Sequence, residues 1–153
     1  MANETTKRLT EVLRRTHPEE AGRVLEEYAE KLVPGEGAFS EYVRAVIKRH
    51  GCTQQGVFRM ADIPERYGYK LVSGEKRTNR RDILLRLFLA AGFSLEEVER
   101  ALKLYGMAEL YPRFPRDAVL IIAVNSGMRD PYSVDELLEK HGEAPLARCG
   151  SEE

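Results

Sequence analysis

Apolar residues recur along most of the chain at the spacing of an amphipathic α-helix. The stretch 39–49 shows this most clearly, with one apolar stripe formed by Phe39, Tyr42, Val43, Val46 and Ile47. Strict period-two alternation is absent, and β-branched residues do not gather into a segment bounded by turns. The pattern therefore predicts an all-α fold.

Capping and breaking residues divide this pattern into nine helices. Their predicted ranges are 6–15, 18–32, 39–49, 54–61, 64–73, 80–91, 95–105, 116–126 and 134–141. The expected N-caps are Thr53, Asn79, Ser94 and Ser133, and the two serines are expected to form capping boxes with Glu97 and Glu136. From Gly142 onward the composition predicts a frayed chain.

The clearest break in the chain is the sequence Val-Pro-Gly-Glu-Gly at 33–37. It suggests an N-terminal helical segment and linker at 1–38 and a compact core at 39–91. A C-terminal helical extension at 92–146 and a disordered tail at 147–153 follow.

Part of the chain looks like a duplicated helical hairpin. Arg81-Asp82 precedes Gly92 by the same spacing that separates Arg116-Asp117 from Gly127, and each glycine is followed by a predicted helix. In the second copy the expected loop is four residues longer. Such a duplication most simply stacks one hairpin on the other around a shared core. We therefore expect Arg81 to be paired locally rather than to bind a ligand.

Charge is distributed unevenly along the sequence. The net charge is −1, but residues 39–91 hold 11 basic and 5 acidic residues and so carry +6, between flanks of −2 and −5. This asymmetry is expected when one face meets an anionic partner. Chance clustering of solvated charges explains the charge pattern equally well.

Several classes of function find no support in the sequence. The longest apolar run, 118–124, is too short to cross a bilayer, and the first residues lack a secretory signal, so a cytoplasmic protein is expected. Cys52 and Cys149 lie far apart and form no zinc motif. No catalytic motif is present. We expect no enzyme activity, no metal and no cofactor.

The segment 41–91 resembles the phage-repressor (Xre) family. The resemblance rests on Thr53-Gln54 opening one helix, a tight turn, a helix that ends in Ser73-Gly74, and the basic pair Lys76-Arg77. Further motifs resemble a bacterial subgroup with a C-terminal helical extension: Tyr67-Gly68-Tyr69, Arg81-Asp82, Leu110-Tyr111-Pro112-Arg113 and Arg116-Asp117. It implies a lambda-repressor-like helix-turn-helix bundle with N-terminal helices and a C-terminal helical hairpin extension.

The resemblance also implies roles for individual residues in binding double-stranded DNA. Gln54 would contact the phosphate backbone and brace the helix 64–73. The outward face of that helix would enter the major groove with Glu65, Arg66, Tyr69 and Lys70. Phosphate contacts would come from Ser73, Lys76 and Arg77.

Four residues depart from the family pattern. Phe58 stands where a small alanine is usual, so either the helices move apart or Phe58 turns outward. Asp62 replaces the usual turn glycine, and Gly68 lies inside a helix, where it would permit close packing. Glu65 places a negative charge on the expected DNA-facing side. One of the two tyrosines at 67 and 69 is expected in the core.

These observations favour a sequence-specific DNA-binding transcriptional regulator that acts as a homodimer. Its dimer surface would be either the apolar helix around 118–124 or the N-terminal helices. A helix-turn-helix-derived protein-interaction module that does not bind DNA is the main alternative, supported by Glu65 and the acidic flanks. A sensor with a small molecule between the duplicated hairpins is a third possibility.

Overall fold

The computed structural model describes residues 2–28 and 37–150. The chain divides into two compact units, residues 1–34 and 35–153. Every regular element among the described residues is a helix, so the predicted all-α class is confirmed. None of the described helices is long and apolar enough to cross a membrane.

The N-terminal unit contains two α-helices, α1 (Ala2–Arg15) and α2 (Ala21–Glu27), joined through the 3-10 turn η1 (Pro18–Glu20). Among the described side chains of this unit Val24 is buried, whereas Leu13 and Leu25 are exposed. The helix predicted at 18–32 therefore begins as a 3-10 turn and gives way to an α-helix that ends at Glu27, and positions 29–32 lie outside the described residues.

The larger unit contains the remaining α-helices. They are α3 (Ala38–Arg49), α4 (Gln54–Ala61), α5 (Glu65–Ser73), α6 (Arg81–Ala90), α7 (Leu95–Tyr105), α8 (Pro115–Asn125) and α9 (Pro131–Lys140). Two predicted caps are confirmed. The Thr53 hydroxyl accepts a hydrogen bond from the Gly56 amide, and Ser94 and Glu97 form the expected capping box.

Two other predicted caps are wrong. Arg80, not Asn79, occupies the cap position of α6, and it makes no capping side-chain bond; its amide instead donates to the buried Thr78 hydroxyl. α9 begins three residues earlier than predicted, at Pro131, and is capped by Asp130. Proline suits the first turn of a helix because its missing N–H has no intrahelical partner there.

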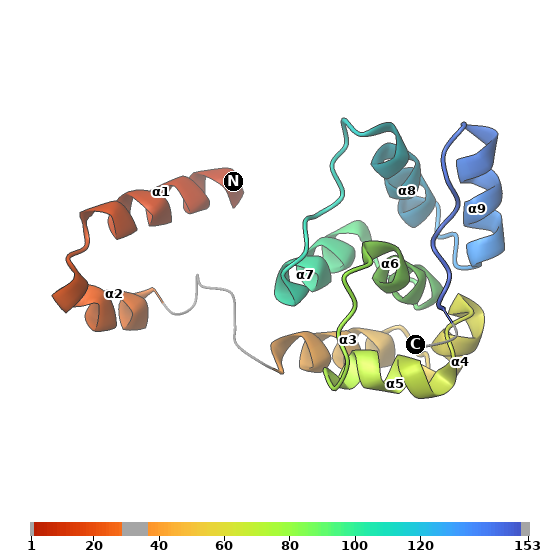
Figure 1. The fold of residues 1–153 in the computed structure, drawn as a ribbon, viewed down its shortest axis with the longest axis horizontal. Coiled ribbons are helices and arrows are strands. Elements are labelled where there is room, and N and C mark those ends of the chain that lie inside the picture. Colours follow the sequence, from red (N-terminus) through yellow and green to blue (C-terminus); the bar gives the residue numbers. More distant parts are fainter. Residues whose placement is uncertain (1, 29–36, 151–153) are drawn as a thin grey trace. The chain divides into compact units, whose positions relative to one another are not determined.

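Helix α6 is the centre of the larger unit. Figure 1 shows it between α3 and α5 on one side and α8 on the other. All eight residues from 83 to 90 are buried, because α6 packs against both α4 and α9. A helix that is apolar almost all round is typically one enclosed on every side.

Arg86 is the one charged residue in this buried run, with 2% of its surface exposed. Its guanidinium donates to the carbonyl oxygen of Ala61 at the end of α4, at 3.2 Å. It also donates to the carbonyl oxygens of Leu146 and Ala147, at 3.2 and 2.7 Å. The side chain therefore ties the chain that follows α9 to the end of α4.

The prediction that the chain frays from Gly142 onward is wrong as far as residue 150. Leu146 is 2% exposed, and its amide donates to the buried carboxylate of Asp135 at 2.8 Å. Residues 151–153 lie outside the described part. This packing could not be predicted from the sequence, because the segment 142–150 has few apolar residues. It is held mainly by hydrogen bonds to residues far away in the chain.

The duplicated hairpins are joined by exchanged ion pairs. Arg81 pairs with Asp117 of the second copy, and Arg116 donates to both carboxylate oxygens of Asp82 at 3.0 and 2.8 Å. Arg81 is thus paired, as expected, but with the opposite copy rather than locally. The loop of the second copy is also shorter than predicted: α9 begins at Pro131, so this loop has one extra residue instead of four.

The same four side chains also bind the segments that follow each hairpin. The remaining oxygen of Asp117 accepts from the Tyr111 amide at 2.9 Å, and Asp82 accepts from the Ala147 amide at the same distance. Arg81 donates to the Glu109 carbonyl, and Arg116 to that of Pro145. Because the pattern is equivalent in both directions, the two hairpins form a unit with approximate two-fold symmetry.

Candidate nucleic-acid interface

Helix α5 has one buried face and one exposed face. Its buried residues are Tyr67, Gly68, Leu71 and Val72, which pack into the core. The residues predicted to face DNA all lie on the other side: Glu65, Arg66, Tyr69, Lys70 and Ser73. Lys70 is half-buried and the other four are exposed. The structure therefore brings five of the eight predicted site residues onto one surface, which we call the α5 face.

The α5 face is mainly cationic. Among the described residues Arg66 and Lys70 form no ion pair, and neither does Lys76 in the loop that follows. Glu65 is the acidic exception, and its carboxylate accepts a weak hydrogen bond from the Gln55 side chain at 3.5 Å. Free cationic groups on an exposed helix are available to an anionic partner, because no carboxylate competes for them.

The angle between α4 and α5 is set by a tight turn. Asp62 has φ 56°, in the left-handed region that residues other than glycine seldom adopt. Ile63 follows as a buried anchor, and its amide donates to the Phe58 carbonyl at 3.0 Å. Asp62 thus adopts, at the end of α4, the left-handed conformation that aspartate tolerates better than most residues.

Phe58 is neither turned outward nor accommodated by separated helices. It is fully buried, and its ring lies directly against Gly68 of α5. The same ring contacts the exposed Tyr69 edge-to-face, with the two ring centroids 4.9 Å apart. Phe58 therefore fixes how closely the helices approach and where Tyr69 stands on the α5 face.

The resemblance implied that Gln54 braces α5, but the side-chain contact from the start of α4 to α5 comes from its neighbour. Gln55, not Gln54, contacts the first residue of α5. Gln54 is half-buried, and its Oε1 accepts no hydrogen bond from any described residue. Gln54 begins α4, near the positive end of the helix dipole.

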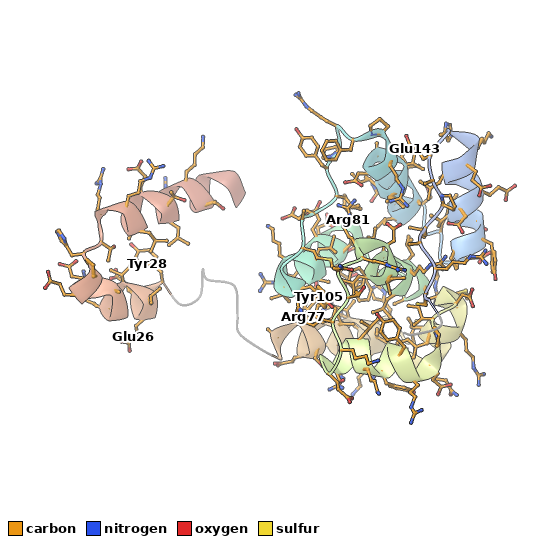
Figure 2. The ribbon with its side chains drawn as sticks, in the orientation of Figure 1. Glu26, Tyr28, Arg77, Arg81, Tyr105 and Glu143 are labelled. Carbon is orange, nitrogen blue, oxygen red and sulfur yellow. The ribbon has the colours of Figure 1, made fainter. Side chains whose placement is uncertain are left out.

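Arg77 points away from the α5 face. Its guanidinium lies 4.1 Å from the ring centroid of Tyr105 and donates to the Tyr105 carbonyl at 2.6 Å, and Figure 2 shows the two residues side by side. Tyr105 ends α7, so Arg77 neutralises the negative end of that helix. With Lys76 and Met107 it lines an open pocket of about 780 Å³ between the 76–79 loop and α7.

Two further basic residues lie near α5, and the sequence pattern does not single them out. Arg59 is exposed on α4, and Arg148 lies with it at the α4–α5 turn, around a smaller pocket that also includes Asp62. Arg59 could have been found from its place on the polar side of α4. Arg148 could not, because the segment after Gly142 was expected to fray.

The described residues contain no group of three or more His, Cys, Asp or Glu side chains that could bind a metal ion. Comparison of the chain with protein-family models, with curated proteins and with solved structures finds no match in any of the three.

Proposed function

We propose that this chain is a sequence-specific DNA-binding transcriptional regulator, in which α4, the turn and α5 form a helix-turn-helix. The observation that carries the proposal is the α5 face, where Arg66 and Lys70 are without acidic partners on a helix whose opposite side is firmly packed. Two short helices joined by a tight turn, with the second helix exposed, are the outline of this motif.

The proposed docking places α5 in the major groove. Arg66, near its N-terminal end, would contact base edges, since a guanidinium matches the two acceptors of guanine. Lys70 and Tyr69 would lie beside it. Lys76 and Ser73, at the far end, would contact backbone phosphates, as would Gln54 from the start of α4.

Such a helix reads only a few base pairs. Proteins of this kind usually pair, so that two copies cover two half-sites one helical turn apart. We therefore propose a homodimer as the DNA-binding form.

Gel shift against genomic fragments at low and physiological salt tests the proposal. We expect wild-type protein to shift a subset of fragments, and the double variant Arg66→Ala, Lys70→Ala to lose this shift. The control Arg14→Ala, Lys140→Ala makes the same change in charge on exposed residues of α1 and α9 and should bind as wild type does. Absence of any shift at low salt, or a full shift with the Arg66 and Lys70 variant, would contradict the proposal.

A protein-interaction module is the second candidate. Glu65 favours it, because a carboxylate at the exposed start of α5 repels DNA phosphates. This candidate predicts no response to DNA and a protein partner that covers the α5 face. Glu65→Gln separates the two ideas: it should strengthen DNA binding by a regulator and weaken binding of a basic protein partner.

A further inference from the structure

Helices α6 and α8 occupy equivalent positions in the two hairpins but differ in burial. The exchanged pairs Arg81–Asp117 and Arg116–Asp82 align the first turn of one helix with the first turn of the other. Every residue of α6 from 83 to 90 is buried. In α8 the residue equivalent to Leu87 is Ile122, and it is 56% exposed.

The difference has a structural origin. Between the two hairpins the packing is matched, since α6 lies against α9 and α8 against α7. α6 is covered in addition by α4, with which it makes its most extensive packing, whereas among the described residues α8 packs mainly on α9 and α7. Ala118 and Ile122 of α8 are therefore more exposed than their α6 equivalents Ile83 and Leu87, yet they remain apolar.

The open side continues into the loop before α8. Tyr111 and Phe114 are 47% and 60% exposed, and their rings contact each other edge-to-face at 4.8 Å between centroids. Together with the half-buried Ala118 and with Ile122 they form one apolar surface, which we call the α8 surface. Contiguous exposed apolar residues of this kind typically mark an interaction site.

We propose that the α8 surface joins two copies of this chain, with α8 of one copy antiparallel to α8 of the other. The inference deepens the proposed function, since it names the surface of the dimer proposed there, but its evidence is independent of DNA. The equivalent residues of α6, Ile83 and Leu87, are buried in a helix that packs on other helices, so a helix is a suitable partner for the open surface of α8.

The charges around α8 favour a second copy as the occupant and set its direction. The one acidic residue of α8, Asp117, is buried against Arg81, so two α8 surfaces meet without carboxylate repulsion. Arg113 is exposed beside the N-terminal end of α8. Antiparallel pairing brings it to the negative, C-terminal end of the second copy's helix, whereas parallel pairing would bring two Arg113 side chains together.

The expected interface is two-fold symmetric and small. Residues 115 and 122 would exchange contacts across the axis, and Ala118 would lie near its centre, where a small side chain lets the helices approach closely. An 11-residue helix is about 16 Å long. A contact of this length is below the standard interface size, so we expect a dimer with a dissociation constant on the order of micromolar.

Analytical ultracentrifugation of the full chain, without DNA, tests the proposal over a range of concentrations. Wild-type protein should show a monomer–dimer equilibrium. Ile122→Asp should raise the dissociation constant by roughly tenfold or more, because it places an unpaired carboxylate in an apolar contact. Leu25→Asp, an equivalent change at a similarly exposed residue of α2, should leave the equilibrium unchanged.

Three results would overturn the proposal: a monomer at every concentration, a dimer unaffected by Ile122→Asp, or a dimer broken by Leu25→Asp instead. Circular dichroism checks that each variant is folded; if Ile122→Asp is not, Phe114→Ser tests the same surface.

A chain with Cys52→Ser, Cys149→Ser and Ala118→Cys tests the direction of the two helices, since antiparallel dimers should form a disulfide between the two Ala118→Cys positions across the axis. A dimer that binds no DNA refutes the proposed DNA binding alone, whereas a DNA-binding dimer that Ile122→Asp leaves intact refutes this inference alone.

Discussion

The ring of Phe58 occupies the space that a side chain at residue 68 would need. A Cβ built on Gly68 would lie 2.6 Å from Cγ and from Cδ1 of that ring, well inside van der Waals contact. A large residue on α4 is thus matched by a missing side chain on α5. This complementarity sets the spacing of the two helices whose outer face we propose to bind DNA.

The first prediction follows from this contact. Gly68→Ala should destabilise the protein by about 1–3 kcal/mol through overpacking, despite the gain of about 1 kcal/mol in helix propensity. Adding Phe58→Leu should recover part of the loss, because the smaller side chain frees space. Urea unfolding of both single variants and the double variant measures the coupling free energy between residues 58 and 68. Strictly additive changes in the free energy of unfolding would show that the Phe58 ring does not limit the side chain at residue 68.

The second prediction concerns the exchanged ion pairs. Asp117→Asn and Asp82→Asn should each lower the free energy of unfolding by about 2–4 kcal/mol, because each leaves a partly buried arginine without its carboxylate. Similar losses are expected from the approximate symmetry. Glu139→Gln, at an exposed residue of α9, serves as the control. If neither aspartate variant loses more unfolding free energy than Glu139→Gln does, the exchanged ion pairs do not stabilise the protein.

The third prediction is a dependence on pH. Burial opposes ionisation of Glu97, but hydrogen bonds from the Ser94 amide, His50 and Arg49 lower its pKa to about 2. Burial likewise opposes ionisation of Asp82, but bonds from Arg116 and the Ala147 amide lower the pKa of that carboxyl. A lowered pKa in the folded state stabilises the protein above the ordinary pKa of the group, and this stability is lost as pH falls below it.

Stability should therefore decrease from about pH 5 to about pH 2, and Glu97→Gln should flatten this decrease. The melting temperature as a function of pH measures the effect. Glu96→Gln, at the exposed neighbouring residue, should keep the wild-type profile. An unchanged slope in Glu97→Gln would mean that its ion pairs with Arg49 and His50 contribute little in solution.

The fourth prediction distinguishes Lys76 from Arg77, for which the sequence predicts the same role in phosphate binding. Lys76→Ala should reduce the salt dependence of DNA binding by about 0.9 in log–log slope, as expected for one lost phosphate contact. Arg77→Ala should instead lower stability by about 1–2 kcal/mol, since its guanidinium is bound to Tyr105. Anisotropy titrations at several salt concentrations and urea unfolding test the pair. Equal changes in slope would show that Arg77 also reaches a phosphate.

Local signals in the sequence predicted most helices, because caps and apolar spacing act within a few residues. Thr53, Gly74 and the Ser94–Glu97 box stand at helix ends as expected. The start of α9 was misplaced because Ser133 offers a second plausible cap two residues after Pro131. Here a competing local signal gave the wrong boundary.

Long-range interactions account for the features that the sequence could not predict. Arg86 is an ordinary surface residue by type, and only the distant carbonyls of Ala61, Leu146 and Ala147 make its burial possible. The exchange of partners between the two Arg-Asp pairs is likewise invisible in sequence, since each arginine has an aspartate next to it. The α5 face was predictable because a helix displays every third or fourth residue on one side.

Base recognition by Arg66 tests the central claim most directly. Fluorescence anisotropy would compare the genomic fragment that binds best with a duplex of scrambled sequence, for wild type and for Arg66→Ala. The account predicts that wild type prefers the fragment and that Arg66→Ala loses about 1–3 kcal/mol of this preference while still binding both duplexes. Equal binding of the two duplexes by wild type, or an undiminished preference in Arg66→Ala, would contradict it.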